Sequence, residues 1–406
     1  MSGVKYYLGL CAIAKNETPY LREWTAYHRL IGFERIFIYD NESDIPVDET
    51  LRDFDDADLV ETYRIEGKGR QLTAYNHCLQ KHGPECEWLA FFDLDEFLLL
   101  HGDKDARIFL SRYEEHAALA LSVMLFGSNG QLGHAPGLVT ERFTRSIGYC
   151  LDVKCIVRPA LVTLPISPHH FTYAECGTAV ATNGLPAFGG YAPFTPGAAQ
   201  INHYYVKSQQ EYEKRLERGD AVYTQNNPRS LALFYQQAAR TGREESGILR
   251  HAPGIRRMMK SGTGRHIEAD SPLLLAEPYP LSLERLNAAL QNGDTGLAHL
   301  VFCLSRRRFG DKAFFWRLGV KACLAQEDYE GALQAARHLV ELAQVPESYE
   351  ALFEAQSAAG LQEEARRNAV FLSRVAEAGS PQREKARQWL LENGLDPAVA
   401  HLWPEE

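Results

Sequence analysis

The strongest indication of the fold is the segment Phe91-Phe92-Asp93-Leu94-Asp95-Glu96-Phe97. Three acids interrupt an apolar run, and residues 88–92 before them are typical of a strand buried on both faces. Because side chains alternate along a strand, Asp93 and Asp95 are expected to point the same way. Buried carboxylates need a cation, and oxygen ligands suit Mg²⁺ or Mn²⁺. The alternative is a solvated strand end, since a lone D-x-D is common.

Toward the N-terminus, strand-like and helix-like blocks alternate. Strands are expected over 6–14, 35–39 and 59–65, with helices following Asn16 and starting near Gln71. Short connections between such blocks predict a doubly wound, mainly parallel α/β sheet. Ligands of these sheets bind beyond the carboxyl ends of the strands.

Polar residues follow each of those strand ends and form the predicted donor site. Several of these residues also have a purely structural explanation. Asn16 is explained as a helix cap, and Asp40 and Asn41 are explained as an Asx turn. Arg70 is explained as a solvated side chain. The expected donor-binding residues are Asn16, Glu17, Asp40, Asn41, Arg70, Gln71 and Asp93.

Toward the C-terminus the pattern changes twice. Short strand-like runs fill residues 120–205, and His203 follows one of them, where it is either a core histidine or an imidazole ligand beside Asp93 and Asp95. Beyond about residue 283, Ala, Leu, Glu and Arg dominate. Ala332 and Ala365 stand in similar segments 33 positions apart, near the 34-residue tetratricopeptide period, although a plain helical bundle explains them too. We expect a first domain over 1–240, a linker or extension over 241–282 and an all-α, repeat-like domain over 283–406.

Composition narrows the class of protein. The 406 residues carry a net charge of −10, which disfavours nucleic-acid binding. The eight cysteines include no C-x-x-C pair, so buried reduced thiols are expected. No apolar run reaches the length that a membrane span requires. A cytoplasmic protein without a transmembrane segment is the expectation.

A set of motifs between residues 6 and 220 resembles glycosyltransferase family 92 and its bacterial family-2-like relatives. The motifs stand in the family's order and are specific together, not singly. They are Cys11–Glu17, Glu23-Trp24, Tyr27-His28, Ile38–Ser43, Ala74-Tyr75-Asn76, Asp93–Phe97, Phe126–Gly130, Lys154–Pro159 and Asn202–Ser208.

This resemblance implies a GT-A (nucleotide-diphospho-sugar transferase) fold and a nucleotide-sugar donor. It implies a metal, Mn²⁺ or Mg²⁺, held by Asp93 and Asp95, and it makes His203 a much better ligand candidate. Members of the family use UDP-galactose and invert the anomeric carbon, so a UDP-sugar and a saccharide or other hydroxyl acceptor are expected.

An inverting transferase needs one general base, and we expect Glu141 in that role, with Glu175 and Asp152 as rivals. Lys154, Arg158 or Arg70 is expected to help neutralise the leaving group.

Two other functions fit parts of the sequence. A nucleotidyltransferase also pairs an α/β sheet with carboxylate-bound Mg²⁺, but residues 14–17 lack the Gly-rich loop typical of that class. We expect the helical domain to contact a protein partner, a second copy of the chain or the acceptor. In a non-catalytic adaptor this domain would be the active part, and the intact Asp93, Asp95 and His203 argue against that function.

Overall fold

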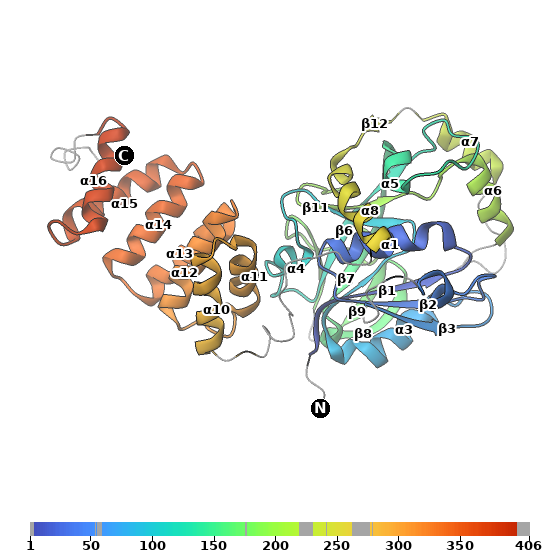
Figure 1. The fold of residues 1–406 in the computed structure, drawn as a ribbon, viewed down its shortest axis with the longest axis horizontal. Helices are drawn as coiled ribbons and strands as arrows, with labels where there is room; N and C mark the ends of the chain where they lie inside the picture. Colours follow the sequence, from blue (N-terminus) through green and yellow to red (C-terminus); the bar gives the residue numbers. More distant parts are fainter. Residues whose placement is uncertain are drawn as a thin grey trace. The chain divides into compact units, whose positions relative to one another are not determined.

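The computed structural model describes residues 4–52, 54, 59–174, 177–218, 230–240, 242–261, 277 and 279–395. The chain forms two compact units, 1–266 and 267–406 (Figure 1). None of the described helices is long and apolar enough to cross a membrane.

The first unit is built on one large mixed sheet with the strand order β3-β2-β1-β4-β7-β6-β11-β5. Two short strands pair off this path, β10 with β6 and β12 with β7, while β8 and β9 form a separate two-stranded sheet. The strands are β1 (Tyr6–Ala14), β2 (Arg35–Asp40), β3 (Val60–Arg64), β4 (Cys86–Phe91), β5 (Glu96–Leu100), β6 (Ala118–Phe126), β7 (Arg145–Val157), β8 (Val162–Ser167), β9 (His170–Tyr173), β10 (Ala179–Ala181), β11 (Ala199–His203) and β12 (Arg243–Glu244).

The N-terminal half of this sheet is parallel, as expected. β1 pairs in parallel with β2 and β4, and β2 with β3, so these strands all end at one edge. The other half of the sheet contains antiparallel pairs. β7 runs antiparallel to its two neighbours, β4 and β6, and β5 runs antiparallel to β11. The expected α/β class, with a helical C-terminal region in the described residues, is confirmed.

Helices cover the sheet on both faces (Figure 1). They are α1 (Thr18–Leu30), α2 (Val47–Thr50), α3 (Gln71–His82), α4 (Ala106–Leu110), α5 (Val139–Arg142), α6 (Gln209–Arg218), α7 (Leu231–Ala238) and α8 (Ala252–Ser261), with 3₁₀ turns at Gly83–Glu85, Pro159–Leu161 and Gly247–His251. On α1, the apolar faces of Trp24 and Tyr27 are fully buried. Their polar atoms are satisfied by β5, because Trp24 Nε1 donates to Glu96 O and Tyr27 Oη to Leu98 O.

Residues 243–261 lie with the first unit. β12 pairs with β7, and α8 packs on α1. The predicted linker or extension over 241–282 therefore begins, in the described residues, with elements that belong to the sheet-containing unit.

The second unit consists of helices in its described residues. They are α10 (Tyr279–Gln291), α11 (Thr295–Ser305), α12 (Ala313–Ala325), α13 (Tyr329–Leu342), α14 (Pro346–Ala358), α15 (Gln362–Val375) and α16 (Pro381–Glu392). Each packs on the next along the chain. Ala332 in α13 and Ala365 in α15 are both fully buried.

Every second helix of this unit starts in the same way. The residues before α11, α13 and α15 have nearly equal backbone angles, at Asp294 (φ −82°, ψ 73°), Asp328 (φ −82°, ψ 75°) and Leu361 (φ −82°, ψ 69°). These positions are 34 and 33 residues apart. The residue just before each has a positive φ, at Gly293, Glu327 and Gly360. We propose that this recurring turn marks a helical repeat.

Candidate functional site

Asp93 and Asp95 lie in a turn between two strands, and Glu96 is the first residue of the second strand. β4 ends at Phe91 and β5 begins at Glu96. Between them the amide of Glu96 donates to the carbonyl of Asp93 at 3.0 Å. The expected strand alternation of Asp93 and Asp95 is therefore wrong here, because the chain turns where the strand was expected to continue. The predicted placement beyond the carboxyl end of the fourth strand is confirmed.

Strand pairing brings His203 to this turn. β11 runs antiparallel to β5, so His203 lies directly opposite Glu96. Its Nε2 is 3.4 Å from Asp95 Oδ1 and its Nδ1 is 3.6 Å from Glu96 Oε1. Nε2 is buried and has no hydrogen-bond partner among the described residues. Two residues 108 positions apart in sequence, Asp95 and His203, thus meet at one point.

Two cations neutralise part of the acidic turn. Lys154 Nζ on β7 is buried and lies 2.8 Å from Asp93 Oδ2 and 3.1 Å from Glu96 Oε2. Arg215 on α6 donates to Asp95 Oδ2 at 2.7 Å. Burial by itself would raise the pKa of Asp95, but Arg215 and His203 outweigh burial and hold that pKa well below its usual value. Asp93 follows the same rule, with Lys154 as its main counter-charge.

Glu96 is the acid whose negative charge is least stabilised by the neighbouring cations. Its side chain is 1% exposed, and burial raises its pKa to about 7, although Lys154 opposes the shift. Asp93 and Asp95 add to the rise because each repels a further negative charge. Three carboxylates thus face two permanent cations, which is an arrangement with room for one more cation.

A pocket of about 540 Å³ adjoins this cluster and shares Arg215 with it. Its walls mix acidic and basic side chains with two tyrosines. The walls include Asn16, Glu17, Tyr20, Lys207, Arg215 and Arg218.

Backbone strain is concentrated at this pocket. Asn16 (φ 53°) and Lys207 (φ 51°) are two of the five non-glycine residues with positive φ in the described part of the chain. Each costs roughly 1–2 kcal/mol relative to an ordinary backbone, and such strain gathers at binding sites. The Asn16 side chain is held by Asp44, to which its Nδ2 donates at 3.0 Å. Asn16 is therefore not the cap of α1, whose N-cap position is Glu17.

Glu17 connects the pocket's cations. Its carboxylate pairs with Arg218, and its Oε2 lies 4.0 Å from Lys207 Nζ. The ammonium of Lys207 also lies 4.0 Å from the centre of the Tyr20 ring. Glu17 Oε2 is buried without a hydrogen-bond partner among the described residues.

The other predicted donor residues mostly hold loops together. Asp40 Oδ1 accepts from the amide of Ser43, and its Oδ2 from the amide of Val47. Asn41 Nδ2 donates to the carbonyls of Ile65 and Gly67. Asp40 therefore fixes the loop beyond β2, and Asn41 ties that loop to the segment after β3.

Gln71 and Arg70 differ in their relation to the acidic turn. Gln71 is buried and donates to Asp93 Oδ1 at 2.7 Å, so it belongs to the cluster. Arg70 is exposed, and its Nε donates to the carbonyl of Glu66.

The candidate bases do not contact the acidic turn in the described structure. Glu141, on α5, pairs with Arg256 of α8. Asp152, on β7, accepts from the thiol of Cys150. Glu175 lies outside the described residues. Arg158, expected to help the leaving group, pairs instead with Glu87 at 2.6 Å.

The pocket's basic residues escaped the sequence analysis. Lys207 stands inside the Asn202–Ser208 motif, and Arg215 and Arg218 are one turn apart on α6. The spacing of the two arginines indicates a basic helix face, but it points to a binding site only when β11 is known to lie beside β5.

Among the described residues, Asp93, Asp95 and His203 are not a group whose ligand atoms all lie within 4.8 Å of one another.

Comparison with known proteins identifies the family. The sequence model of glycosyltransferase family 92 matches residues 7–217. Glycosyltransferase family 92 proteins of Oryza sativa subsp. japonica (29% identical over 220 residues) and Arabidopsis thaliana (28% over 240 residues) match 53% and 55% of this chain. The matches cover 36% and 39% of those relatives, so the chain spans under two fifths of their length.

Solved structures give weaker likenesses. Staphylococcus aureus TarS 1-349 is 12% identical, with a TM-score of 0.28, covering 87% of this chain and 92% of that one. The same protein in complex with UDP also has a TM-score of 0.28 at 12% identity, with 94% and 92% coverage. Scores this low bear on neither fold nor function. The family match covers more than half of the chain and includes the acidic turn and His203: the chain belongs to glycosyltransferase family 92.

Proposed function

We propose that the chain is a metal-dependent glycosyltransferase that moves a sugar from a nucleotide-sugar, expected to be a UDP-sugar, to a hydroxyl of a saccharide acceptor with inversion. The observation that carries this proposal is the meeting of Asp95 and His203 beside a pocket that shares Arg215 with them. Family membership supports the reaction class.

The acidic turn fits a divalent ion on three counts. His203 Nε2 is buried without a hydrogen-bond partner and faces Asp95 Oδ1. Imidazole nitrogen suits Mn²⁺ better than Mg²⁺. The three carboxylates exceed the two permanent cations beside them. Asp95 and His203 would hold the ion, with Asp93 as the next carboxylate of the same turn. When bound, the ion supplies Lewis-acid neutralisation of the nucleoside diphosphate.

The chain's own side chains supply the remaining binding chemistry. Lys207 and Arg218 line the pocket with Arg215 and suit the negative charge of a diphosphate. Asn16 and Glu17 line the same pocket. Asp40, Asn41, Arg70 and Gln71 complete the donor site that we propose along the carboxyl ends of β1 to β4.

The proposed general base is Glu141. Its carboxylate pairs with Arg256 of α8, which orients the side chain. Replacement of Glu141 by Gln should then lower transfer to the acceptor while leaving donor binding unchanged.

Location and partners complete the proposal. The seven described cysteines are free thiols, as in proteins of the reducing cytoplasm. The exposed helices of the second unit suit contact with a protein partner or a second copy.

Incubation with a panel of UDP-sugars and Mn²⁺, scored by release of free nucleotide, tests the function. The Asp95→Asn variant should lose Mn²⁺-dependent turnover. Asp103→Asn is a matched control, because Asp103 pairs with Arg112 away from the site. Full activity of Asp95→Asn would contradict the metal-dependent mechanism. Conversion of a UDP-sugar and added pyrophosphate to UTP and a sugar 1-phosphate would indicate a nucleotidyltransferase, and no turnover of any donor would favour an adaptor.

A further inference from the structure

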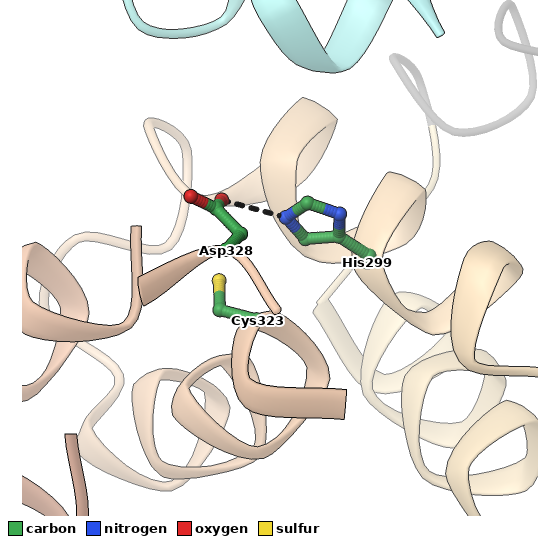
Figure 2. Close-up of side chains that lie close together, drawn as sticks. All are labelled: His299, Cys323 and Asp328. Carbon is green, nitrogen blue, oxygen red and sulfur yellow. Dashed lines mark hydrogen bonds and ion pairs between the residues drawn. The ribbon is translucent and has the colours of Figure 1, made fainter. Parts of the chain in front are cut away.

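A second cluster of ligand-type side chains lies in the helical unit, where the proposed function uses none of them. His299 on α11, Cys323 on α12 and Asp328 before α13 place one ligand atom each within 4.8 Å of one another (Figure 2). His299 Nε2 lies 2.9 Å from Asp328 Oδ2. The side chains of His299 and Asp328 are 3% and 9% exposed, and Cys323 is fully buried. Three separate elements therefore converge on one closed point.

A fourth ligand-type side chain joins this cluster from α11. Cys303 follows His299 by four residues, which puts both on the same face of the helix. Both thiols, Cys303 and Cys323, raise the pKa of the His299 imidazole, although Cys303 is not in the group whose ligand atoms all lie within 4.8 Å of one another. The four side chains thus offer two sulfurs, one nitrogen and one carboxylate oxygen.

The glycine at position 331 keeps the carboxylate in place. A Cβ at Gly331 would stand 2.2 Å from Asp328 Oδ2, which is closer than atoms can approach. The amide of Gly331 donates to Asp328 Oδ1 at 3.0 Å. One carboxylate oxygen therefore caps α13 while the other faces His299, and the orientation depends on a residue without a side chain.

We propose that His299, Cys303, Cys323 and Asp328 form a structural site for one Zn²⁺-type ion. Two thiolates, one imidazole and one carboxylate make the four-coordinate, sulfur-containing set that zinc prefers. Ligand atoms at about 2.0–2.3 Å from zinc lie roughly 3.5 Å from one another in a tetrahedron. His299, Cys323 and Asp328 are already within 4.8 Å of one another and need only small shifts, whereas Cys303 must turn its side chain toward them. The ion takes the place of the proton shared by His299 and Asp328, and the two thiols release their protons to solvent.

The burial of the cluster decides between a structural and a catalytic role. A catalytic zinc keeps one position open to water or substrate, whereas here the three converging side chains are buried and a fourth buried side chain, Cys303, is available for the last position. The ion would link α11, α12 and the start of α13. The proposal does not depend on the function proposed for the first unit, since Asp93, Asp95 and His203 contain no sulfur.

Cobalt titration of the full-length chain tests the site directly. The protein is stripped with EDTA under reducing conditions and titrated with Co²⁺, which gives a thiolate-to-cobalt charge-transfer band only where sulfur binds the ion. We expect such a band at one equivalent, and its removal by added Zn²⁺. Cobalt held by the acidic turn of the first unit gives no such band. Absence of the band would overturn the proposal and leave the His299–Asp328 pair as a hydrogen-bonded helix cap.

Variants assign the ligands. Cys323→Ser and Cys303→Ser should each weaken the cobalt affinity about tenfold or more. Cys155→Ser removes a thiol that is equally buried in the first unit and should leave it unchanged. His299→Gln retains a donor toward Asp328 but no imidazole, so it separates ligation from the hydrogen bond. An unchanged band in both cysteine variants would overturn the assignment.

Thiol labelling of the unmodified chain keeps the test independent of how the variants fold. Zn²⁺ should slow alkylation of Cys303 and Cys323 relative to the EDTA-treated protein and leave Cys155 unaffected. Equal rates with and without Zn²⁺ would contradict the site.

Discussion

The ammonium of Lys154 donates a 2.8 Å hydrogen bond to Asp93 Oδ2 and thereby ties β7 to the turn that follows β4. The same ammonium lies 3.1 Å from Glu96 Oε2. Burial would lower the pKa of Lys154, but Asp93 and Glu96 outweigh burial and raise that pKa well above its usual value. One buried cation therefore serves two acids of the proposed site.

Lys154→Met should destabilise the fold strongly. The substitution keeps most of the apolar stem but leaves Glu96 buried without its cation, and removing one partner of a buried pair costs about 3–5 kcal/mol. Urea unfolding at pH 7 measures the loss. Lys104→Met, on an exposed lysine, should change the free energy of unfolding by less than about 0.5 kcal/mol. A similarly small effect for Lys154→Met would show that the pair contributes little.

Glu96 should make stability fall as the pH rises through the neutral range. Burial raises its pKa from 4.5 to about 7, so between these values the folded chain holds a proton that the unfolded chain has lost. This proton stabilises the fold below pH 4.5, and its contribution of about 3 kcal/mol disappears as the pH passes 7. Asp93, Asp95, Lys154 and His203 face Glu96 and remain in the comparison variant.

The measurement compares wild type with Glu96→Gln in EDTA between pH 4.5 and 8. The free energy of unfolding of wild type relative to that of Glu96→Gln should decline as the pH rises, because the amide of the variant does not titrate. A difference that is independent of pH would show that Glu96 has an ordinary pKa.

The sequence was sufficient to predict the regular part of the fold. β1 spans Tyr6–Ala14 as expected, because a continuous apolar run indicates a strand covered on both faces. α3 starts at Gln71 as expected. The family motifs supplied His203, which spacing by itself could not separate from a core histidine.

The contacts of the candidate site could not be predicted, because they depend on residues far apart in the sequence. Arg215 and Lys154 reach the acidic turn only because α6 and β7 are placed beside it, and no local pattern encodes that contact. The positive φ of Lys207 is likewise invisible in a sequence that has no glycine there. Cys303 and Cys323 are 20 positions apart, so they do not form a short metal-binding motif that could be recognised in the sequence.

Lys207→Met should weaken UDP binding about tenfold with little change in stability. The substitution retains the buried stem and removes one charge from the pocket, and a charge-assisted hydrogen bond contributes about 1.5–3 kcal/mol. Glu17 keeps Arg218 as its closer ion-pair partner, so the substitution leaves no unpaired carboxylate at this point. Calorimetry with UDP measures the affinity, and Lys104→Met is again the control. Unchanged affinity would place the diphosphate outside this pocket.

Glu327→Gly should stabilise the helical unit by about 1 kcal/mol. Glu327 has φ 60° in the turn before α13, where the matching turns before α11 and α15 have Gly293 (φ 73°) and Gly360 (φ 75°). In all three turns the next residue donates its amide to a carbonyl five positions earlier at 2.9 Å, so the backbone conformation is shared. Glycine adopts positive φ without the penalty of a Cβ, whereas glutamate pays it.

The control for this prediction has the opposite sign. Gln334 is exposed within α13, so Gln334→Gly should destabilise by about 0.5–1 kcal/mol through the loss of helix propensity. Thermal unfolding of the EDTA-treated full chain, followed by circular dichroism at the helix band, compares both variants with wild type. If Glu327→Gly is no more stable than wild type, the turn before α13 is held by side-chain contacts of Glu327 and not by the backbone pattern of the proposed repeat. A gain for Glu327→Gly together with a loss for Gln334→Gly would show that the repeat's turn, and not glycine as such, sets the stability.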